Sequence, residues 1–239
     1  MINRDFVGPI GNASPKYETA NPVLRSLLGR FLRAVDAEAA DAAPARVLDV
    51  GCGEGIVAER LARLLSEATI LGVDADDVRL RIAWERRGLG NLSFATASAY
   101  DLPFGEDSFD LVCAFEVLEH LERPRDALAE MARVSRQSLL VSVPREPHWQ
   151  LSHLVAGRNL RRFGDTPGHI NHWSRAAFAS LISDYGQVTR VRSSFPWTLA
   201  AVDVRAQTRR GEDDSRRRRP LEQGRRGRAK RPRRLDVDG

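Results

Sequence analysis

Three closely spaced glycines followed by an aspartate are the residues of this chain best suited to bind a ligand. Gly51, Gly53 and Gly55 lie where a short apolar run gives way to a helical pattern. Glycine adopts backbone angles that other residues avoid, and it lets a ligand approach the main chain closely. The first N–H groups of the following helix suit an anionic group. Asp74 ends the next apolar run, where a carboxylate can accept hydrogen bonds from both hydroxyls of a ribose.

The charges around these glycines indicate which adenosine-containing cofactor fits. The loop reads GxGxG rather than the GxGxxG of dinucleotide-binding proteins. Asp49 and Glu54 flank the glycines, and residues 47–59 include no Lys or Arg. A pyrophosphate would meet two carboxylates there without a compensating cation, whereas an ammonium and a sulfonium would be attracted. S-adenosylmethionine carries both groups, so we expect it rather than NAD. The alternative is a tight turn that binds nothing.

Histidines form the second group of residues suited to chemistry. An imidazole titrates near neutral pH and can take a proton from a reacting group. His169 and His172 lie just before a predicted helix, and His120 lies in an ExxEH run. Trp149 and Trp173 lie nearby in the sequence and are suited to clamp a flat or apolar molecule. The spacing matches no standard zinc motif. The alternative for each histidine is a hydrogen-bonded structural role.

Apolar runs and helical patterns alternate along the chain and predict the fold that positions these residues. A helix is expected to begin after Asn21-Pro22 and to end near 41–44, and the other helices are expected at 56–66, 76–88, 124–134 and 174–184, the last capped by Ser174. Strands are expected at 47–50, 69–73, 92–97, 109–114, 138–143, 188–191 and 198–204. Strands that alternate with helices indicate an α/β fold with a mostly parallel sheet covered on both faces.

Two segments depart from this alternation. Residues 1–20 are rich in Asn, Pro and Gly and are expected to form a flexible leader. Residues 144–173 contain four of the five histidines, among them His148 and His153, which are weaker candidates for catalysis. About 30 residues without a clear strand is long for a connection within a domain, which indicates a lid-like binding insertion. An insertion without function is the alternative.

The net charge of +5 is unevenly distributed. Residues 207–239 carry 13 Lys+Arg and 6 Asp+Glu, so this tail is basic, while the rest of the chain is mildly acidic. The tail has almost no large apolar side chains and cannot offset its ordering entropy by burial, so we expect it to be disordered. Weak, salt-sensitive contacts with nucleic acid or an anionic membrane are one role for it, and solubility is the other.

Cysteine usage and hydropathy indicate a cytoplasmic protein. Cys52 and Cys113 are the two cysteines, and neither belongs to a CxxC pair, which excludes a disulfide scaffold. The sequence contains no apolar run of about 18 residues, so a transmembrane segment is not expected. Its N-terminus lacks the apolar stretch of a secretory signal.

Taken together, the motifs resemble those of the class I S-adenosylmethionine-dependent methyltransferases. Val47–Gly55 is similar to their first glycine motif, Asp74 to their ribose-binding acid, and Tyr100–Phe104 and Asp107–Leu121 to the segments after their third strand and around their fourth. The Glu116–His120 run is most similar to the small-molecule branch, which includes the ubiquinone and menaquinone biosynthesis methyltransferases. The resemblance implies one Rossmann-like domain over residues 21–206, with a seven-stranded, mostly parallel sheet.

The resemblance also implies which residues hold the methionine end of the cofactor. Asp49 and the three loop glycines would bind it, and Phe115 would lie near the methionyl group. Tyr17 would cover it from the leader. Arg25 would either pair with the methionine carboxylate or lie in solvent.

At the other end, the resemblance implies that Asp74 binds the ribose. Ala75 would pack near the adenine, and Ser98 and Ala99 would meet its edge. Many relatives have Asp at the position of Ser98. A serine side chain is shorter and uncharged, although its hydroxyl can still accept a hydrogen bond.

The ExxEH run raises the question of a metal. We expect Glu116, Glu119 and His120 at the start of a helix, where the two carboxylates would face one direction. In the quinone O-methyltransferases that the run resembles, equivalent residues have been linked to a divalent metal. The alternative is that Glu119 and His120 cap and orient the helix. Because the run is common across the superfamily, we favour the alternative and predict no metal.

The sequence therefore predicts an S-adenosylmethionine-dependent methyltransferase that acts on a small molecule, at oxygen, with a quinone-, lipid- or polyketide-like acceptor. Its catalysis would depend on aligning the reactants, with His120, His169 or His172 as a base. One alternative is an RNA or protein methyltransferase recruited by the basic tail, which the acidic body and the missing NPPY-type motif disfavour. Another is a binding module that has kept the cofactor fold without catalysis.

Overall fold

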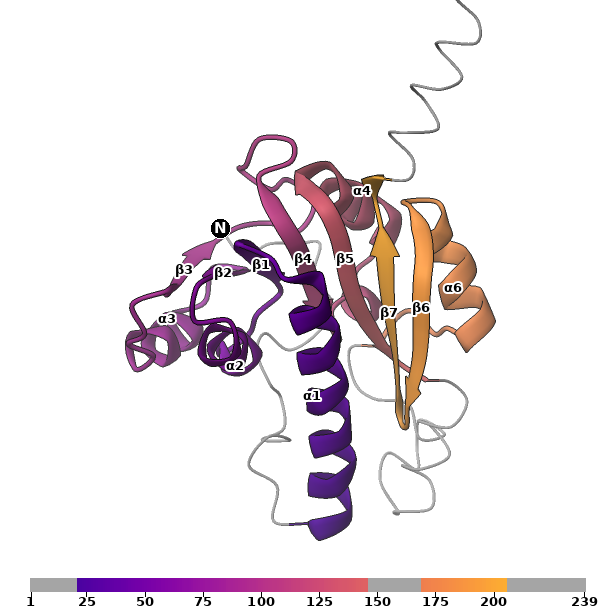
Figure 1. The fold of residues 1–239 in the computed structure, drawn as a ribbon, viewed down its shortest axis with the longest axis horizontal. Coiled ribbons are helices and arrows are strands. Elements are labelled where there is room, and N and C mark those ends of the chain that lie inside the picture. Colours follow the sequence, from indigo (N-terminus) through magenta and orange to yellow (C-terminus); the bar gives the residue numbers. More distant parts are fainter. Residues whose placement is uncertain (1–20, 146–168, 206–239) are drawn as a thin grey trace, which may run out of the picture.

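A seven-stranded sheet forms the centre of the molecule (Figure 1). The computed structural model describes residues 21–145 and 169–205. Its strands are β1 (Arg46–Val50), β2 (Thr69–Asp74), β3 (Leu92–Thr96), β4 (Phe109–Phe115), β5 (Ser135–Pro144), β6 (Gln187–Ser194) and β7 (Trp197–Asp203). They are ordered β3-β2-β1-β4-β5-β7-β6. Strand β7 runs antiparallel to both β5 and β6, and the other neighbouring strands are parallel. The predicted Rossmann-like, mostly parallel sheet is confirmed.

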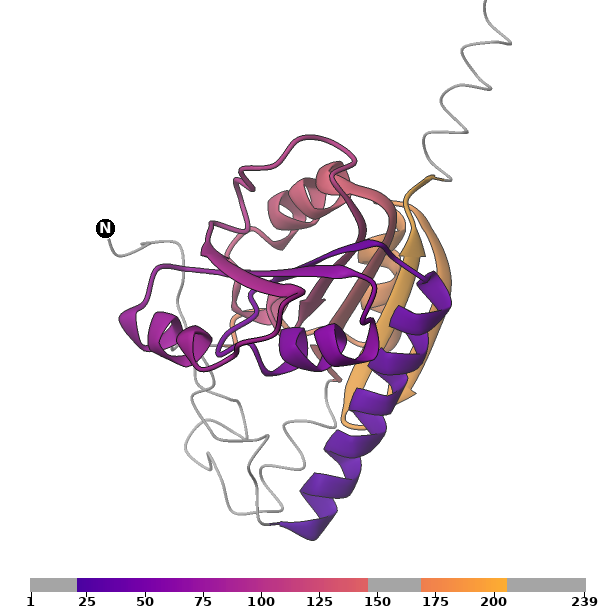
Figure 2. The same cartoon turned by 60° about the vertical axis from the view of Figure 1, so that its left-hand side comes forward.

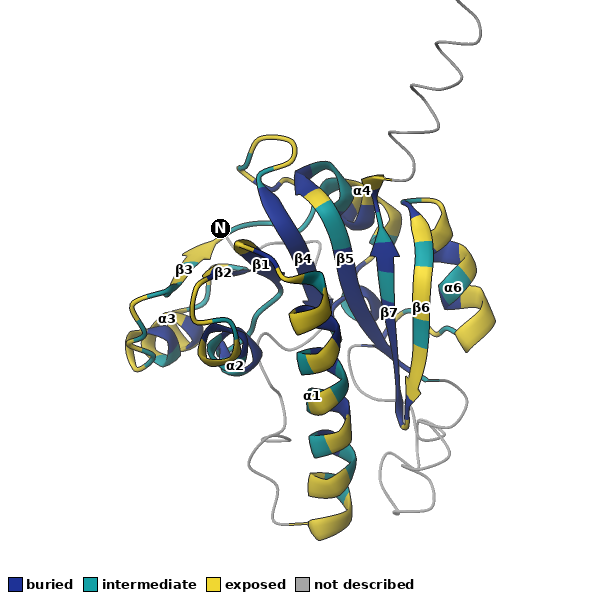
Figure 3. Cartoon of the chain, viewed as in Figure 1, coloured by how far each residue is buried: buried dark blue, intermediate teal, exposed yellow. Residues whose placement is uncertain are grey.

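Helices cover both faces of the sheet (Figure 2). They are α1 (Pro22–Ala42), α2 (Ile56–Leu64), α3 (Val78–Glu85), α4 (Pro124–Val134) and α6 (Arg175–Ser183), with a single 3₁₀ turn, η2 (Leu118–His120). Helices α1 and α2 share one apolar core with the sheet, and α4 and α6 share another. Along β1, Val47 belongs to the first core and Leu48 to the second. Central strands buried on both faces are typical of parallel sheets (Figure 3).

Helix α1 begins and ends as the sequence predicts. The Asn21 side chain accepts hydrogen bonds from the N–H groups of Val23 and Leu24, and Pro22 occupies the first turn. Ala43 adopts a left-handed conformation that ends the helix. A stripe at three- and four-residue spacing packs against the sheet, made up of Leu28, Phe31, Val35 and Ala39.

Several predicted elements have different bounds in the structure. The helix predicted at 76–88 spans only Val78–Glu85, because the Asp77 side chain caps it by accepting from Arg79 N. The strand predicted at 138–143 begins at Ser135, directly after α4. At the start of the predicted insertion 144–173, Pro144 belongs to β5, and Arg145 pairs with Trp173 at its end. The leader 1–20, residues 146–168 and the tail lie outside the described residues.

The described helices are all too short or too polar to cross a bilayer.

Phe31 connects α1 to the sheet, and its truncation tests that contact. Its ring is fully buried, 5.0 Å from that of Trp197 and 6.3 Å from that of Phe115. We expect Phe31→Ala to lower the free energy of unfolding by about 3–5 kcal/mol, because a large cavity forms in the core. Thermal unfolding measures this as a fall in Tm on the order of 10 °C. The control Ile82→Ala removes a side chain that is 47% exposed and should change Tm little; an equal loss in both variants would contradict the assignment.

Candidate active site

The glycine loop connects the end of β1 to the start of α2. Gly51, Gly53 and Gly55 all have positive φ angles, 71°, 54° and 79°. The N–H groups of Gly51 and Cys52 donate to the carbonyl of Val73 at the end of β2, at 2.8 and 3.1 Å. This confirms that the loop needs conformations that glycine adopts without strain.

The three glycines differ in what lies beside them. A β-carbon at Gly51 would lie 2.5 Å from Cγ2 of Val117, and one at Gly55 would lie 2.5 Å from the Phe94 ring. A β-carbon at Gly53 would meet no atom of the described residues within 4 Å. Gly51 and Gly55 are therefore needed for packing as well, whereas Gly53 faces open space from which a ligand can approach.

Trp84 of helix α3 and Arg87, two residues beyond its end, hold the glycine loop in place. The indole N–H of Trp84 donates to the carbonyl of Gly53 at 2.8 Å, and Nε of Arg87 donates to the carbonyl of Glu54 at 2.5 Å. Arg87 also pairs with Glu59 of α2, so its charge is already compensated within the protein. Neither support was predicted from the sequence. Their only signal was an aromatic and a cationic residue in the predicted helix 76–88.

Two carboxylates lie at the ends of neighbouring strands beside the loop. Asp74 Oδ2 accepts from Gly53 N and Asp74 Oδ1 from Ala75 N, both at 2.7 Å. Burial raises the pKa of Asp74, although these two hydrogen bonds oppose the rise. Asp49 in β1 is 2% exposed, and burial together with the charge of Asp74 raises its pKa to about 8. A cationic ligand would relieve this repulsion and ionise Asp49.

The residues predicted to meet the adenine lie directly after Asp74 and in the turn that follows β3. Ala97 N donates to the carbonyl of Asp74 at 2.9 Å, which places the following turn beside it. The hydroxyl of Ser98 accepts from Tyr100 N at 3.2 Å, and Ala75 and Ala99 are half-buried. Their contacts with adenine remain predictions.

The methionine-end residues divide between described and undescribed parts of the chain. Phe115 ends β4, half-buried, with its ring edge-on to that of Phe31. Arg25 is exposed in the first turns of α1. Tyr17 lies outside the described residues, so its role stays a prediction.

The segment after β4 corrects one expectation. Glu116 has a φ of 57°, so the chain turns sharply there instead of entering a helix. Residues 118–120 form one 3₁₀ turn, and α4 begins only at Pro124, whose fixed φ suits a first helical position. The prediction that the ExxEH run starts a helix, with Glu116 and Glu119 on one face, is therefore wrong.

Residues 169–171 pack against this 3₁₀ turn. The N–H groups of Ile170 and Asn171 both donate to the carbonyl of Glu119, at 2.9 and 3.1 Å. The Asn171 amide donates to the carbonyls of Leu118 and Leu121, at 3.3 and 2.6 Å. The main chain of one segment is thus fixed to that of the other across about 50 residues of sequence.

This packing gathers the three predicted catalytic histidines. The ring centroids of His120 and His169 are 4.9 Å apart, and those of His169 and His172 are 6.5 Å apart. His169 is 9% exposed, whereas His172 is exposed. Ligand atoms of Glu119, His120 and His169 lie within 4.8 Å of one another. His148, His153 and Trp149 lie outside the described residues.

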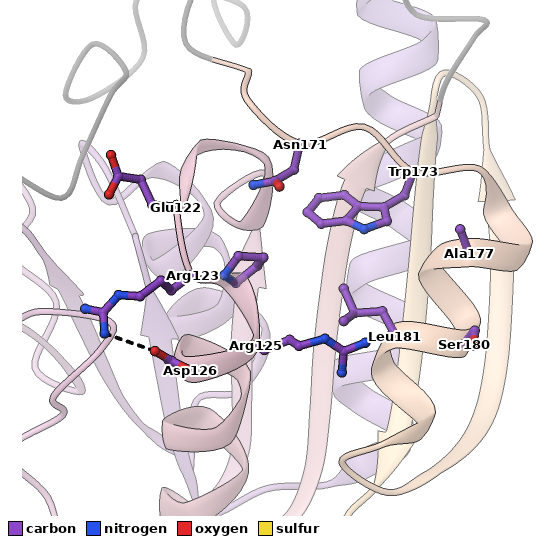
Figure 4. A pocket seen from close by; sticks show the side chains of 10 residues that line it. Glu122, Arg123, Arg125, Asp126, Asn171, Trp173, Ala177, Ser180 and Leu181 are labelled. Atoms are coloured by element: carbon purple, nitrogen blue, oxygen red, sulfur yellow. Dashed lines mark hydrogen bonds and ion pairs between the residues drawn. The ribbon is translucent and has the colours of Figure 1, made fainter.

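A groove of about 640 Å³ lies between the start of α4 and α6 (Figure 4). Trp173 and Leu181 form its apolar side, and Asn171 also lines it. The guanidinium of Arg125 on α4 pairs with Asp184 at 2.6 Å, which links α4 to the end of α6.

Comparison with known proteins shows what part of the chain is similar to. Residues 48–140 match the methyltransferase domain family. The chain is 36% identical over 111 residues to the O-methyltransferase cnsE of Penicillium expansum, covering 45% of this chain and 40% of that protein. It is 38% identical over 97 residues to a fatty-acid O-methyltransferase of Mycolicibacterium smegmatis, covering 41% and 35%. Magnesium protoporphyrin IX methyltransferase from Synechocystis, solved with S-adenosylhomocysteine, shares the fold at 20% identity and a TM-score of 0.56, covering 77% and 88%.

The part of this chain that includes the glycine loop and Asp74 is therefore similar to a methyltransferase domain. The matches span well under half the length of the two curated relatives above. The described residues fit S-adenosylmethionine, the cofactor of such domains. Gly53 leaves an open approach to the main chain, Asp74 lies beside it, and buried Asp49 suits an ammonium group.

The raised pKa of Asp49 predicts how the stability of the protein depends on pH. The folded state holds the Asp49 proton more tightly than the unfolded state does, so its contribution is full below about pH 4 and is lost as pH rises to about 8. We expect Asp49→Asn to abolish this loss, so that Tm of the variant exceeds that of cofactor-free wild type by several degrees at pH 8.5 and approaches it as the pH falls to about 4. Thermal unfolding across pH measures the difference, and parallel curves would refute the assignment.

The glycines predict separable effects on binding and stability. We expect Gly53→Ala to fold with a modest loss of Tm, because its methyl group meets open space, and to bind S-adenosylhomocysteine about 10-fold or more weakly. Gly51→Ala should lose more Tm, since its methyl group overlaps Val117. Calorimetry and thermal unfolding measure both. Unchanged affinity in Gly53→Ala would show that the ligand does not approach this glycine.

Proposed function

We propose that the chain transfers a methyl group from S-adenosylmethionine to an oxygen of a small-molecule acceptor with quinone-, lipid- or polyketide-like character. The position of the histidines carries the proposal. Val117 packs on Gly51 of the glycine loop, and the N–H of His120 donates to the carbonyl of Val117 at 3.0 Å. His169 packs on the same turn. Two imidazoles therefore lie close to the loop proposed to hold the methionine end of the cofactor.

The chemistry requires little beyond alignment and a proton acceptor. S-adenosylmethionine supplies a methyl group bonded to a positively charged sulfur. In the proposed transfer the acceptor O–H bond breaks and its proton passes to a base, a C–O bond forms to the methyl carbon, and the S–C bond breaks with its electron pair left on sulfur. The chain aligns the reactants and accepts the proton. A hydroxyl that is neutral at pH 7 needs this base, which the histidines supply.

The relatives support oxygen as the acceptor atom. One is named an O-methyltransferase and another a fatty-acid O-methyltransferase. Trp173 and Leu181 beside the histidine segment are consistent with an apolar acceptor. The fold itself does not fix the reaction, because many chemistries share it.

The basic tail has a separate proposed role. We assign residues 207–239 to weak, salt-sensitive contacts with nucleic acid or an anionic membrane surface, because 13 Lys+Arg are concentrated there. The tail is outside the proposed transfer. Turnover of a small acceptor should therefore survive its deletion, whereas loss of turnover would favour an RNA or protein substrate recruited by the tail.

An acceptor screen tests the proposed reaction. We expect release of S-adenosylhomocysteine with a member of a panel of hydroquinones, hydroxylated fatty acids and polyketide phenols. In that assay His169→Ala should lower kcat by roughly 100-fold or more, because loss of a general base has that effect, while its affinity for S-adenosylhomocysteine stays unchanged. Asp74→Ala is the contrasting variant and should lose cofactor binding first. Turnover with RNA or protein alone, or an unchanged kcat in His169→Ala, would overturn the proposal.

A further inference from the structure

Trp84 holds the glycine loop at the residue that leaves an approach for a ligand. Its indole N–H donates to the carbonyl of Gly53 at 2.8 Å, and a β-carbon at Gly53 would meet no described atom within 4 Å. We propose that Trp84 is a positioning residue, whose N–H, rather than its ring alone, keeps the loop in the conformation that binds S-adenosylmethionine. This inference rests on the proposed function, because it concerns the cofactor of that function.

The glycines make the loop depend on bonds to its neighbours. Gly51, Gly53 and Gly55 have φ angles of 71°, 54° and 79°. Glycine adopts positive and negative φ angles with similar ease, and it loses more conformational freedom on ordering than any other residue. Local sterics therefore do not select this loop conformation, and hydrogen bonds from neighbouring elements must do so.

Strand β2 fixes the N–H side of Gly53. The Asp74 carboxylate accepts from Gly53 N at 2.7 Å. Asp74 is also the residue predicted to accept hydrogen bonds from the ribose hydroxyls. The bond between Gly53 and Asp74 is therefore shared with the ligand, and it does not by itself keep the empty loop ready for binding.

Trp84 fixes the carbonyl side of Gly53, and it is not among the residues predicted to contact the cofactor. The next carbonyl, that of Glu54, accepts from Nε of Arg87 at 2.5 Å. Two consecutive carbonyls thus point to the same segment. The C=O and N–H of a trans peptide point in opposite directions, so these bonds also determine which way each peptide N–H faces. Without the Trp84 bond, the peptide between Gly53 and Glu54 would be released to rotate.

The ring of Trp84 has a separate, structural role. It stacks on Phe94, with the ring centroids 5.2 Å apart and the planes 6° apart. Phe94 fills the space beside two glycines, since a β-carbon at Gly55 or Gly72 would lie 2.5 or 2.7 Å from its ring. Trp84→Phe keeps an aromatic ring for this stack and removes the donor, so the substitution separates the two roles.

Cofactor binding to the full-length Trp84→Phe variant tests the role of the N–H. One hydrogen bond of this kind corresponds to a factor of roughly 2–10 in an equilibrium constant. The binding-competent loop is then populated less, and the apparent Kd rises in proportion. We expect S-adenosylhomocysteine to bind about 5- to 10-fold more weakly by calorimetry, with a fall in Tm of only a few degrees. With an acceptor from the panel, KM for S-adenosylmethionine should rise while kcat at saturation stays unchanged.

Tyr185→Phe is the matched control. The Tyr185 hydroxyl also donates to a main-chain carbonyl, that of Arg125, at 2.9 Å, but it joins the end of α6 to α4 rather than to the loop. Its loss removes one aromatic donor of the same kind and should leave the Kd unchanged. Benzothienylalanine in place of Trp84 keeps the shape of the indole without the N–H, and it should reproduce the weaker binding should Trp84→Phe fail to fold.

An unchanged Kd in Trp84→Phe, or an equal loss of affinity in Tyr185→Phe, would overturn the role of Trp84 and leave the proposed function intact. Binding of S-adenosylhomocysteine by the wild type without turnover of any acceptor would count against the proposed function alone. Absence of wild-type binding at millimolar S-adenosylhomocysteine would overturn both.

Discussion

The close approach of the glycine loop to its neighbours is the constraint on which the site depends. At Gly51 the main chain passes so near Val117 that no β-carbon fits, and its N–H is bonded to the end of β2. The contact brings the ends of β1, β2 and the segment after β4 to one point. Parallel strands make this possible, because their carboxyl ends lie at the same edge of the sheet.

Charge divides the site into two parts around that point. Asp49 and Asp74 at the ends of β1 and β2 make a buried acidic region, where the protein raises the pKa of Asp49 to about 8. The cost of this repulsion indicates a cationic ligand. On the other side of Val117, the histidines form the region proposed to meet the acceptor. The 3₁₀ turn at Leu118–His120 directly follows Val117. Its hydrogen bonds to residues 170–171 therefore fix where the proposed acceptor region lies relative to the proposed cofactor region.

Much of the fold and of the cofactor side followed from local sequence. The alternation of apolar runs with helical patterns predicted all seven strands, since the central strands are buried on both faces and are therefore largely apolar. GxGxG at a strand-to-helix junction, with Asp74 one strand later, predicted the loop because its conformations require glycine at 51, 53 and 55. The bounds of an element were predicted less accurately where a side-chain hydrogen bond determines them. The Asp77 cap, for example, starts α3 at Val78.

The tertiary structure decided the rest, because the deciding contacts join residues far apart in the chain. Trp84 and Arg87 support a loop about 30 residues before them, and no local pattern indicates such a contact. The ExxEH run predicted the start of a helix, and the positive φ of Glu116 excludes a helix there. Sequence alone identified His120 and His169 as separate candidates. Only the hydrogen bonds between residues 118–121 and 170–171 made them neighbours of each other and of Glu119.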